Sequence, residues 1–188
     1  AQAAINFYTQ FANPSRTVYS WNKSLPNSLD AFIAGDVAMY FGFASEFANV
    51  RQKNPNLNFD VAVIPQSRSG IRATYGKVLA LAIPKTTPNV ERAFSLVRTL
   101  IQPDVTAFMA DILFLPPVRR DLLATRPENA FMQTFHDSAL ISKNVYDFNP
   151  EETDIIFKRM IESIVSGRLT TSEAVVRANG EIDLLRPW

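Results

Sequence analysis

The fold is decided by the stretch Asp30-Ala31-Phe32-Ile33-Ala34-Gly35-Asp36-Val37-Ala38-Met39-Tyr40-Phe41-Gly42. Asn27 lies just before it, where its side chain can cap a helix, and Asp30 favours the positive N-terminal end of that helix. Gly35 is typical of a helix C-terminus, because glycine adopts the left-handed conformation without strain. The apolar residues that follow predict a short buried strand over 37–41. The stretch therefore predicts a helix that passes directly into a strand and a glycine loop.

Apolar periodicity predicts most of the other elements as helices. These helices are predicted over residues 3–11, 45–53, 89–100, 103–111, 119–124, 130–142, 150–165 and 171–185. The Asn149-Pro150 pair and the Thr170-Thr171-Ser172-Glu173 capping box mark the starts of the last two. Two more strands are predicted, over 59–63 from alternation and over 78–83 from an apolar run that fits burial on both faces. We therefore expect a helix-rich α/β protein.

Composition and charge exclude several classes of function. The chain is 47% hydrophobic and 20% charged, as globular proteins are. Nineteen Lys and Arg residues oppose eighteen Asp and Glu residues, and no basic block points to nucleic acid as a partner. The chain has no cysteine and one histidine, His136, which rules out thiolate and multi-histidine metal sites. We expect no cofactor and no metal, and we expect His136 to lie at the surface or its boundary without a role.

The sequence holds no standard enzyme motif, neither a phosphate loop, a nucleophile elbow nor a two-histidine zinc motif. Glu46, Asp147 and Asp154 are the basis for one alternative, a carboxylate-based glycosidase. Aromatic side chains near loops and element ends offer flat faces that suit sugar rings, although each is more often a core residue. They are Tyr19, Trp21, Phe41, Phe43, Phe47, Tyr75, Tyr146 and Phe148. Phe41 is assigned to the core.

The order of these features resembles the C-terminal half of family 1 extracellular solute-binding proteins, the maltose-binding-protein-like receptors of ABC importers. The matching features are Trp21-Asn22, the helix with Phe32 and Gly35, Ala38-Met39, Pro55, Val61-Ala62-Val63-Ile64-Pro65, Tyr75-Gly76, Ile83-Pro84-Lys85, Leu115-Pro116, Ser166-Gly167-Arg168 and Glu173-Ala174. The resemblance covers essentially residues 1–188. It implies a type II periplasmic-binding fold, in which two α/β lobes close over a solute without reaction chemistry.

The resemblance also implies a division of the chain and a set of partners. Residues 1–76 would belong to the second lobe, 77–118 would return to the first lobe as a strand and a helical hairpin, and 119–188 would supply C-terminal helices of the second lobe. The chain would be a fragment whose partners are the missing N-terminal half of the same protein, an ABC permease and a neutral polar solute, with an oligosaccharide favoured. Its location would be extracytoplasmic, in the periplasm or at the cell surface, with a lipid anchor as one means of attachment.

The resemblance further implies which residues contact the solute. The loop after Ala38-Met39 faces the solute in relatives, which makes Phe43, Ser45 and Glu46 candidate ligand-binding residues. Maltose-type relatives carry a stacking tryptophan near this loop. Because Ser45 stands at the comparable place, ring stacking here would have to come from Phe43 or Phe47.

A second group of candidates follows from the same resemblance. Tyr75 and Gly76 match the crossing between the lobes, where a missing side chain lets the ligand or the backbone approach closely. Asp154 and Lys158 stand where relatives carry an aromatic and a basic ligand contact near a helix start. Their spacing of four also allows a structural ion pair with each other, and this alternative stays open.

One alternative does not involve a solute. The apolar hairpin over Asn89–Ala110 could dock a partner protein, and the chain would then be a helical interaction module. Apolar surface left bare on this hairpin is expected to promote dimerisation, swapping or aggregation.

Overall fold

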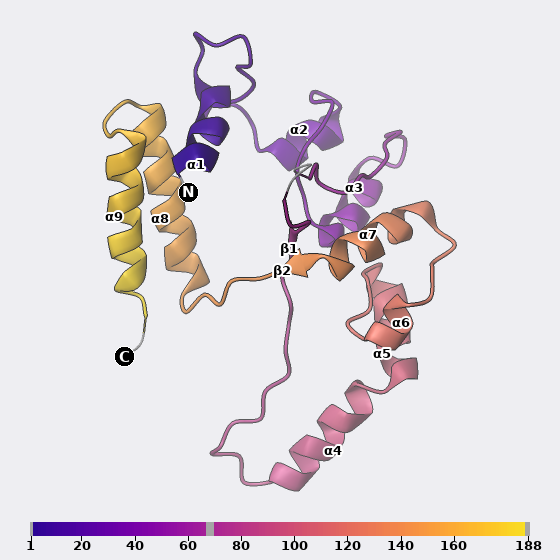
Figure 1. Cartoon of the computed structure of the whole chain (residues 1–188). Helices are drawn as coiled ribbons and strands as arrows, with labels where there is room; N and C mark the ends of the chain where they lie inside the picture. The colour runs from indigo at the N-terminus through magenta and orange to yellow at the C-terminus, as the bar shows by residue number, and fades with distance from the viewer. Residues whose placement is uncertain (1, 67–69, 187–188) are drawn as a thin grey trace. The chain divides into compact units, whose positions relative to one another are not determined.

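A computed structural model of the chain describes residues 2–66 and 70–186 (Figure 1). The chain divides into two compact units. Unit 1 takes in the described residues up to Pro26 and those from Val145 onward, and unit 2 spans Asn27–Asn144. Helices dominate both units, as the sequence predicted. The division into lobe segments that the resemblance implies stays a prediction.

Unit 1 is built from the two ends of the described chain. Its elements are α1 (Gln2–Thr9), the 3₁₀ helix η1 (Gln10–Ala12), α8 (Pro150–Val165) and α9 (Thr171–Asp183). Ile156 and Met160 of α8 pack against Ala174 and Ala178 of α9, and Ile5 of α1 covers this core. The two alanines have small side chains, which lets α8 and α9 approach closely.

The predicted helix starts of unit 1 are confirmed. The Asn149 side chain accepts a hydrogen bond from the Glu152 amide at 3.3 Å. The Thr170 hydroxyl accepts from the Glu173 amide at 3.3 Å, and the Glu173 carboxylate accepts from the Thr170 amide at 2.9 Å, which completes the capping box. Bonds from the Thr170 side chain and backbone also hold the pKa of Glu173 below its ordinary value. Gly167, two residues after the end of α8, adopts the left-handed conformation with a φ of 72°.

Unit 2 contains the remaining elements. They are α2 (Ser28–Ala34), the 3₁₀ helix η2 (Ala44–Glu46), α3 (Phe47–Lys53), β1 (Thr74–Tyr75), α4 (Val90–Leu100), α5 (Pro103–Leu113), α6 (Arg120–Leu123), α7 (Ala130–Leu140) and β2 (Ser142–Lys143). Asn27 caps α2 by accepting from the Leu29 amide at 2.9 Å, and Gly35 ends it with a φ of 86°. Both predicted end signals of this helix are therefore confirmed.

Aromatic rings form the centre of unit 2. The Phe47 ring, at the start of α3, stacks on Phe114 with centroids 4.8 Å apart and an interplanar angle of 14°. Its centroid also lies 4.8 Å from Phe131, 5.7 Å from Phe59 and 5.8 Å from Phe135. With Phe47 itself, these rings come from four stretches of the sequence, and two of the rings lie on α7. Phe47 is thus half-buried among other aromatic rings, which leaves little of its ring for stacking on a ligand.

None of the three predicted strands forms among the described residues. Among the described residues, the strands are β1 and β2, a parallel pair in the register Thr74↔Ser142 and Tyr75↔Lys143. Residues 37–41, 59–63 and 78–83 form no strand. A strand is stable only where a neighbouring backbone pairs with its N–H and C=O groups. The described part of the chain supplies no such neighbour to these segments.

Side-chain burial corrects the predictions in the same places. Leu79 is 99% exposed and Phe41 is 78% exposed, so 78–83 is not buried on both faces and Phe41 is not a core residue. In the segment 59–63, the Phe59 ring packs against Phe47. The Val61 carbonyl accepts a hydrogen bond from the Thr134 hydroxyl of α7 at 3.4 Å.

The sequence led us to expect His136 at the surface or its boundary, but the structure buries it. It is buried on α7 beside Phe135, and its Nδ1 atom has no hydrogen-bond partner in the described structure. Burial lowers the pKa of the imidazole below its ordinary value, against the opposing charge of Asp137 and a bond with the Leu123 backbone. The buried imidazole is therefore held in its neutral form at neutral pH.

Alanine substitution is expected to have opposite effects on stability at Gly35, which follows α2, and at Gly180, which lies within α9. Gly35→Ala forces a side chain into the left-handed conformation at φ 86°, and we expect it to lower the free energy of unfolding by about 1–2 kcal/mol. Gly180→Ala lies inside α9 with no atom within 4 Å of the added Cβ, and we expect it to raise that free energy by about 0.5–1 kcal/mol. Equilibrium urea unfolding of both variants checks the signs. A stabilised Gly35→Ala variant would contradict the helix end described here.

Candidate functional site

The loop that leads into η2 is held in place by Glu46. Its carboxylate oxygen Oε2 accepts a hydrogen bond from the Phe43 amide at 2.7 Å and another from the Tyr40 hydroxyl at 3.3 Å. The Tyr40 ring in turn packs on Phe32, with centroids 5.0 Å apart. A Cβ on Gly42 would collide with the ends of the Glu46 and Tyr40 side chains, so a larger residue here would displace both groups from their present positions. The Phe43 backbone is therefore fixed.

An exposed pair of aromatic rings lies next to this loop. The centroids of Phe43 and Tyr75 are 6.1 Å apart, with an interplanar angle of 60°. Phe43 is 39% exposed and Tyr75 is 56% exposed, so both rings offer area that a ligand could cover. Ser45 lies on η2 and is also exposed. The structure thus brings the predicted residues Phe43, Glu46 and Tyr75 into one neighbourhood of unit 2.

Gly76 is required by the packing of β1 on β2. Its amide donates to the Lys143 carbonyl at 3.1 Å, which extends the ladder by one bond. An added Cβ would lie 2.9 Å from both the Cβ and the Oγ of Ser142, closer than atoms pack. The missing side chain thus leaves room for the Ser142 side chain of β2, and the role of Gly76 at a crossing between lobes stays a prediction.

Two lysines near the aromatic pair were not among the predicted site residues. The Lys77 ammonium lies over the Phe43 ring, 5.0 Å from its centroid. Lys143 is the register partner of Tyr75 across the strand pair. The spacing of two between Tyr75 and Lys77 could have indicated that they share a face, but no local signal connects residue 143 with residue 75.

Asp154 and Lys158 lie in unit 1, where both are exposed on α8. Within the described residues they form no ion pair with each other, so the structural alternative to their ligand role has no support here. Asp147, a candidate for glycosidase chemistry, accepts bonds from the Asn149 amide at 3.0 Å and the Thr153 hydroxyl at 2.9 Å. Asp147 therefore has a structural task at the start of α8.

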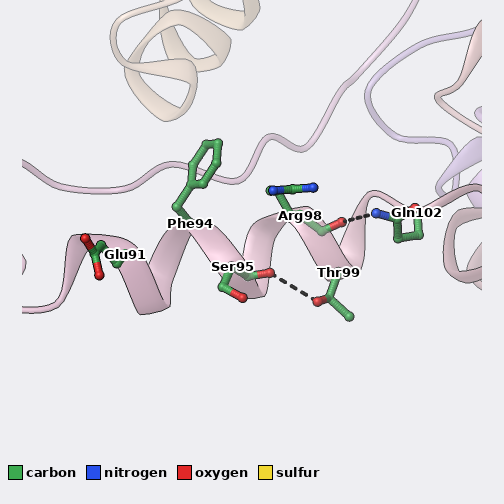
Figure 2. Close-up of a pocket in the computed structure, with 6 residues that line it drawn as sticks. All are labelled: Glu91, Phe94, Ser95, Arg98, Thr99 and Gln102. Atoms are coloured by element: carbon green, nitrogen blue, oxygen red, sulfur yellow. Dashed lines mark hydrogen bonds between the residues drawn. The ribbon is translucent and has the colours of Figure 1, made fainter.

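A hollow on α4 lies away from the predicted residues. Figure 2 shows its lining, which comes from one helix and the turn that follows it. The lining residues are Glu91, Phe94, Ser95, Arg98, Thr99 and Gln102. Two of these side chains bond back to the helix, Thr99 to the Ser95 carbonyl at 3.1 Å and Gln102 to the Arg98 carbonyl at 3.2 Å. A hollow that one helix lines offers a ligand no opposing wall, and we assign it no site.

Residues 2–66 and 70–186 contain neither a metal-binding cluster nor a membrane-spanning helix. No cluster of three or more His, Asp or Glu side chains in these ranges could hold a metal ion. No helix in the same ranges combines the length and the apolar character that a membrane span needs.

A double variant tests the close approach at Gly76. We expect Gly76→Ala to destabilise the protein by about 1–3 kcal/mol, because the methyl group overpacks the contact with Ser142. Ser142→Gly removes both atoms that the methyl group would meet, so the double variant should recover most of the loss in urea unfolding. If Ser142→Gly gives no recovery, the contact described here does not limit residue 76.

The Tyr40 phenol provides a pH-dependent test. Burial raises its pKa to about 12, and the charge and hydrogen bond of Glu46 act in the same direction. In ultraviolet titration, we expect one tyrosine signal, absent from Tyr40→Phe, to appear near this pH. Glu46→Gln should move it toward the ordinary value of about 10, whereas Asp60→Asn should not. Because the phenol binds its proton more tightly in the folded state, its contribution to stability is lost as the pH rises from about 10 to about 12.

The comparisons with known proteins agree with the resemblance. A family model described as bacterial extracellular solute-binding protein matches residues 1–135, which include the loop around Glu46, β1 and Lys77. A comparison with curated proteins found no match. The family match covers well over half of the 188 residues. This chain therefore belongs to the family of bacterial extracellular solute-binding proteins.

Proposed function

We propose that this protein is the extracytoplasmic receptor of an ABC importer and that its solute is a carbohydrate, with an oligosaccharide favoured. Family membership supports an extracellular solute-binding component. The observation that carries the carbohydrate part is the exposed pair of Phe43 and Tyr75, whose centroids are 6.1 Å apart. Aromatic rings cover the apolar face of a sugar ring, and tyrosine adds a hydroxyl for a hydrogen bond.

The proposed mechanism is hinge closure in a type II binding fold. Residues 1–76 and 119–188 belong to the second lobe in this proposal, and 77–118 return to the first. The solute binds the closed form better than the open form and shifts the equilibrium between them. The permease engages the closed form. Lipid anchoring of the receptor is part of the same proposal.

The segment 78–83 supports the return to a first lobe. Leu79 is 99% exposed, Val78 64% and Leu81 60%, and no backbone hydrogen bond joins 78–83 to a described residue. A run that is apolar on both sides fits the centre of a parallel sheet. We propose that the neighbouring strands belong to an N-terminal half of the same protein, so that these 188 residues are a fragment of the receptor.

The exposed helices α4 and α5 also favour a second candidate function. No residue of α4 is buried, and Phe94, Leu96, Phe108 and Ile112 are all more than half exposed. A partner protein that covers this surface would make the chain a helical interaction module. Hydrogen exchange of the natural protein, at the length that its gene encodes, separates the two functions. Protection of 78–113 without any partner favours the receptor, and protection only after a partner is added favours the module.

The aromatic pair is tested by substitution in the natural protein. We expect at least one oligosaccharide of a neutral and acidic panel to raise its melting temperature, and Phe43→Ala or Tyr75→Ala to weaken that binding about tenfold. The reason is that each ring contributes about 1.5 kcal/mol of stacking. Phe7→Ala serves as the control, because Phe7 is also exposed, at 64%, and lies in unit 1. Isothermal titration calorimetry gives the affinities.

Several results would count against the proposal. Binding of amino acids or peptides in place of saccharides would remove the carbohydrate assignment. Equal losses in the control and the two site variants would remove the aromatic pair from the site. Residues 1–188 alone should bind weakly or not at all, so micromolar affinity of this chain by itself would contradict the need for a second half. Turnover of chromogenic glycosides would favour the glycosidase.

A further inference from the structure

The strand pair β1–β2 gives unit 2 two different faces. Thr74 lies on the covered face, where it is buried and its hydroxyl donates to the Ser138 carbonyl of α7 at 2.7 Å. Side chains alternate along an extended chain, so Tyr75 lies on the opposite face, and Lys77, two residues further on, follows it. The parallel register pairs Tyr75 with Lys143, and because register partners project to the same side of a sheet, Lys143 belongs to the face of Tyr75. Two lysines therefore accompany one exposed ring.

The positive charges of these lysines are not balanced by the described structure. Both side chains belong to exposed residues, and no ion pair with a described carboxylate involves either of them. The Lys77 ammonium instead lies 5.0 Å from the centroid of Phe43. A contact between an exposed ammonium and a ring is weak, so the flexible stem of Lys77 can turn to a negative group that arrives.

Among the described contacts, Glu46 is the carboxylate that bonds to the backbone of the ring pair, at Phe43. It already accepts hydrogen bonds from within unit 2. Its Oε2 atom accepts from the Phe43 amide at 2.7 Å and from the Tyr40 hydroxyl at 3.3 Å. These bonds hold the loop under Phe43 and leave the two ammonium groups available. The exposed face thus presents two rings and two cations together.

We propose that Phe43, Tyr75, Lys77 and Lys143 form one subsite for an anionic saccharide unit, whose apolar ring face packs on the two rings and whose carboxylate or sulfate pairs with the two lysines. This inference rests on the proposed saccharide receptor and makes its solute class narrower. It departs from the neutral solute that the resemblance implied. The reason is the register of β1 with β2, which adds Lys143 to a face where the sequence placed only Tyr75.

The test uses the natural protein, at the length that its gene encodes, and matched pairs of probes. Trigalacturonate is compared with its full methyl ester, and galactose 6-sulfate with galactose, by calorimetry at low salt. At least one acidic probe should bind about tenfold more tightly than its neutral counterpart, since charge-assisted bonds are stronger than neutral ones. The pair that shows the preference tells whether the solute carries a carboxylate or a sulfate.

Lysine variants assign the preference to this face. Lys77→Met and Lys143→Met keep the apolar stem and remove the charge, so each should reduce binding of the acidic probe about tenfold and leave that of the neutral probe unchanged. Added salt should lower the affinity for the acidic probe more in the natural protein than in either variant. Lys85→Met, another exposed lysine of unit 2, is the control and should change neither affinity.

The outcomes separate this inference from the proposed function. If neutral probes or maltotriose bind as tightly as the acidic ones, or if neither lysine variant changes the preference, the anionic subsite is overturned and the saccharide receptor stands. If no saccharide of either kind binds while another solute does, both are overturned. Protection of residues 40–47 and 74–77 in hydrogen exchange with the acidic probe is expected, and protection confined to other segments overturns the subsite.

Discussion

The packing of Phe47 is the interaction on which unit 2 depends. Its ring lies near rings from the segment after α3, from the end of α5 and from two turns of α7, so one side chain connects α3 with α5 and α7. Phe47 also begins α3 directly after η2. The contact that builds the core therefore fixes the backbone that carries Phe43 and Glu46. The candidate site lies at the edge of a packed core and not on a free loop.

The sequence predicted the helices well because their signals are local. Asn27, Gly35 and Thr170 each act on atoms within four residues along the chain, so a short stretch contains both the signal and its partner. The strands failed for the opposite reason. The apolar run 78–83 has the composition of a buried strand, but its burial and pairing depend on a neighbouring backbone that the described residues do not supply.

The candidate site was predictable to a similar extent. The resemblance selected Phe43, Glu46 and Tyr75 from separate stretches, and the structure brings them together, although their role in binding stays a prediction. Lys143 could not be predicted from the sequence. It lies beside Tyr75 only because β1 pairs with β2 in this register, and most of unit 2 separates the two strands along the chain. Tyr40 was visible in the decisive stretch, but its bond to Glu46 depends on the turn at Gly42.

The pairing of β1 with β2 also bears on when the site comes into existence. These strands are separated along the chain by α4, α5, α6 and α7, so their contact has a high sequence separation and a large loop-closure entropy. Local helices and caps form before such a contact does. We therefore expect Tyr75 and Lys143 to become neighbours late in the folding of unit 2. Competence to bind would then report complete folding, and a chain with all its helices formed could still lack the site.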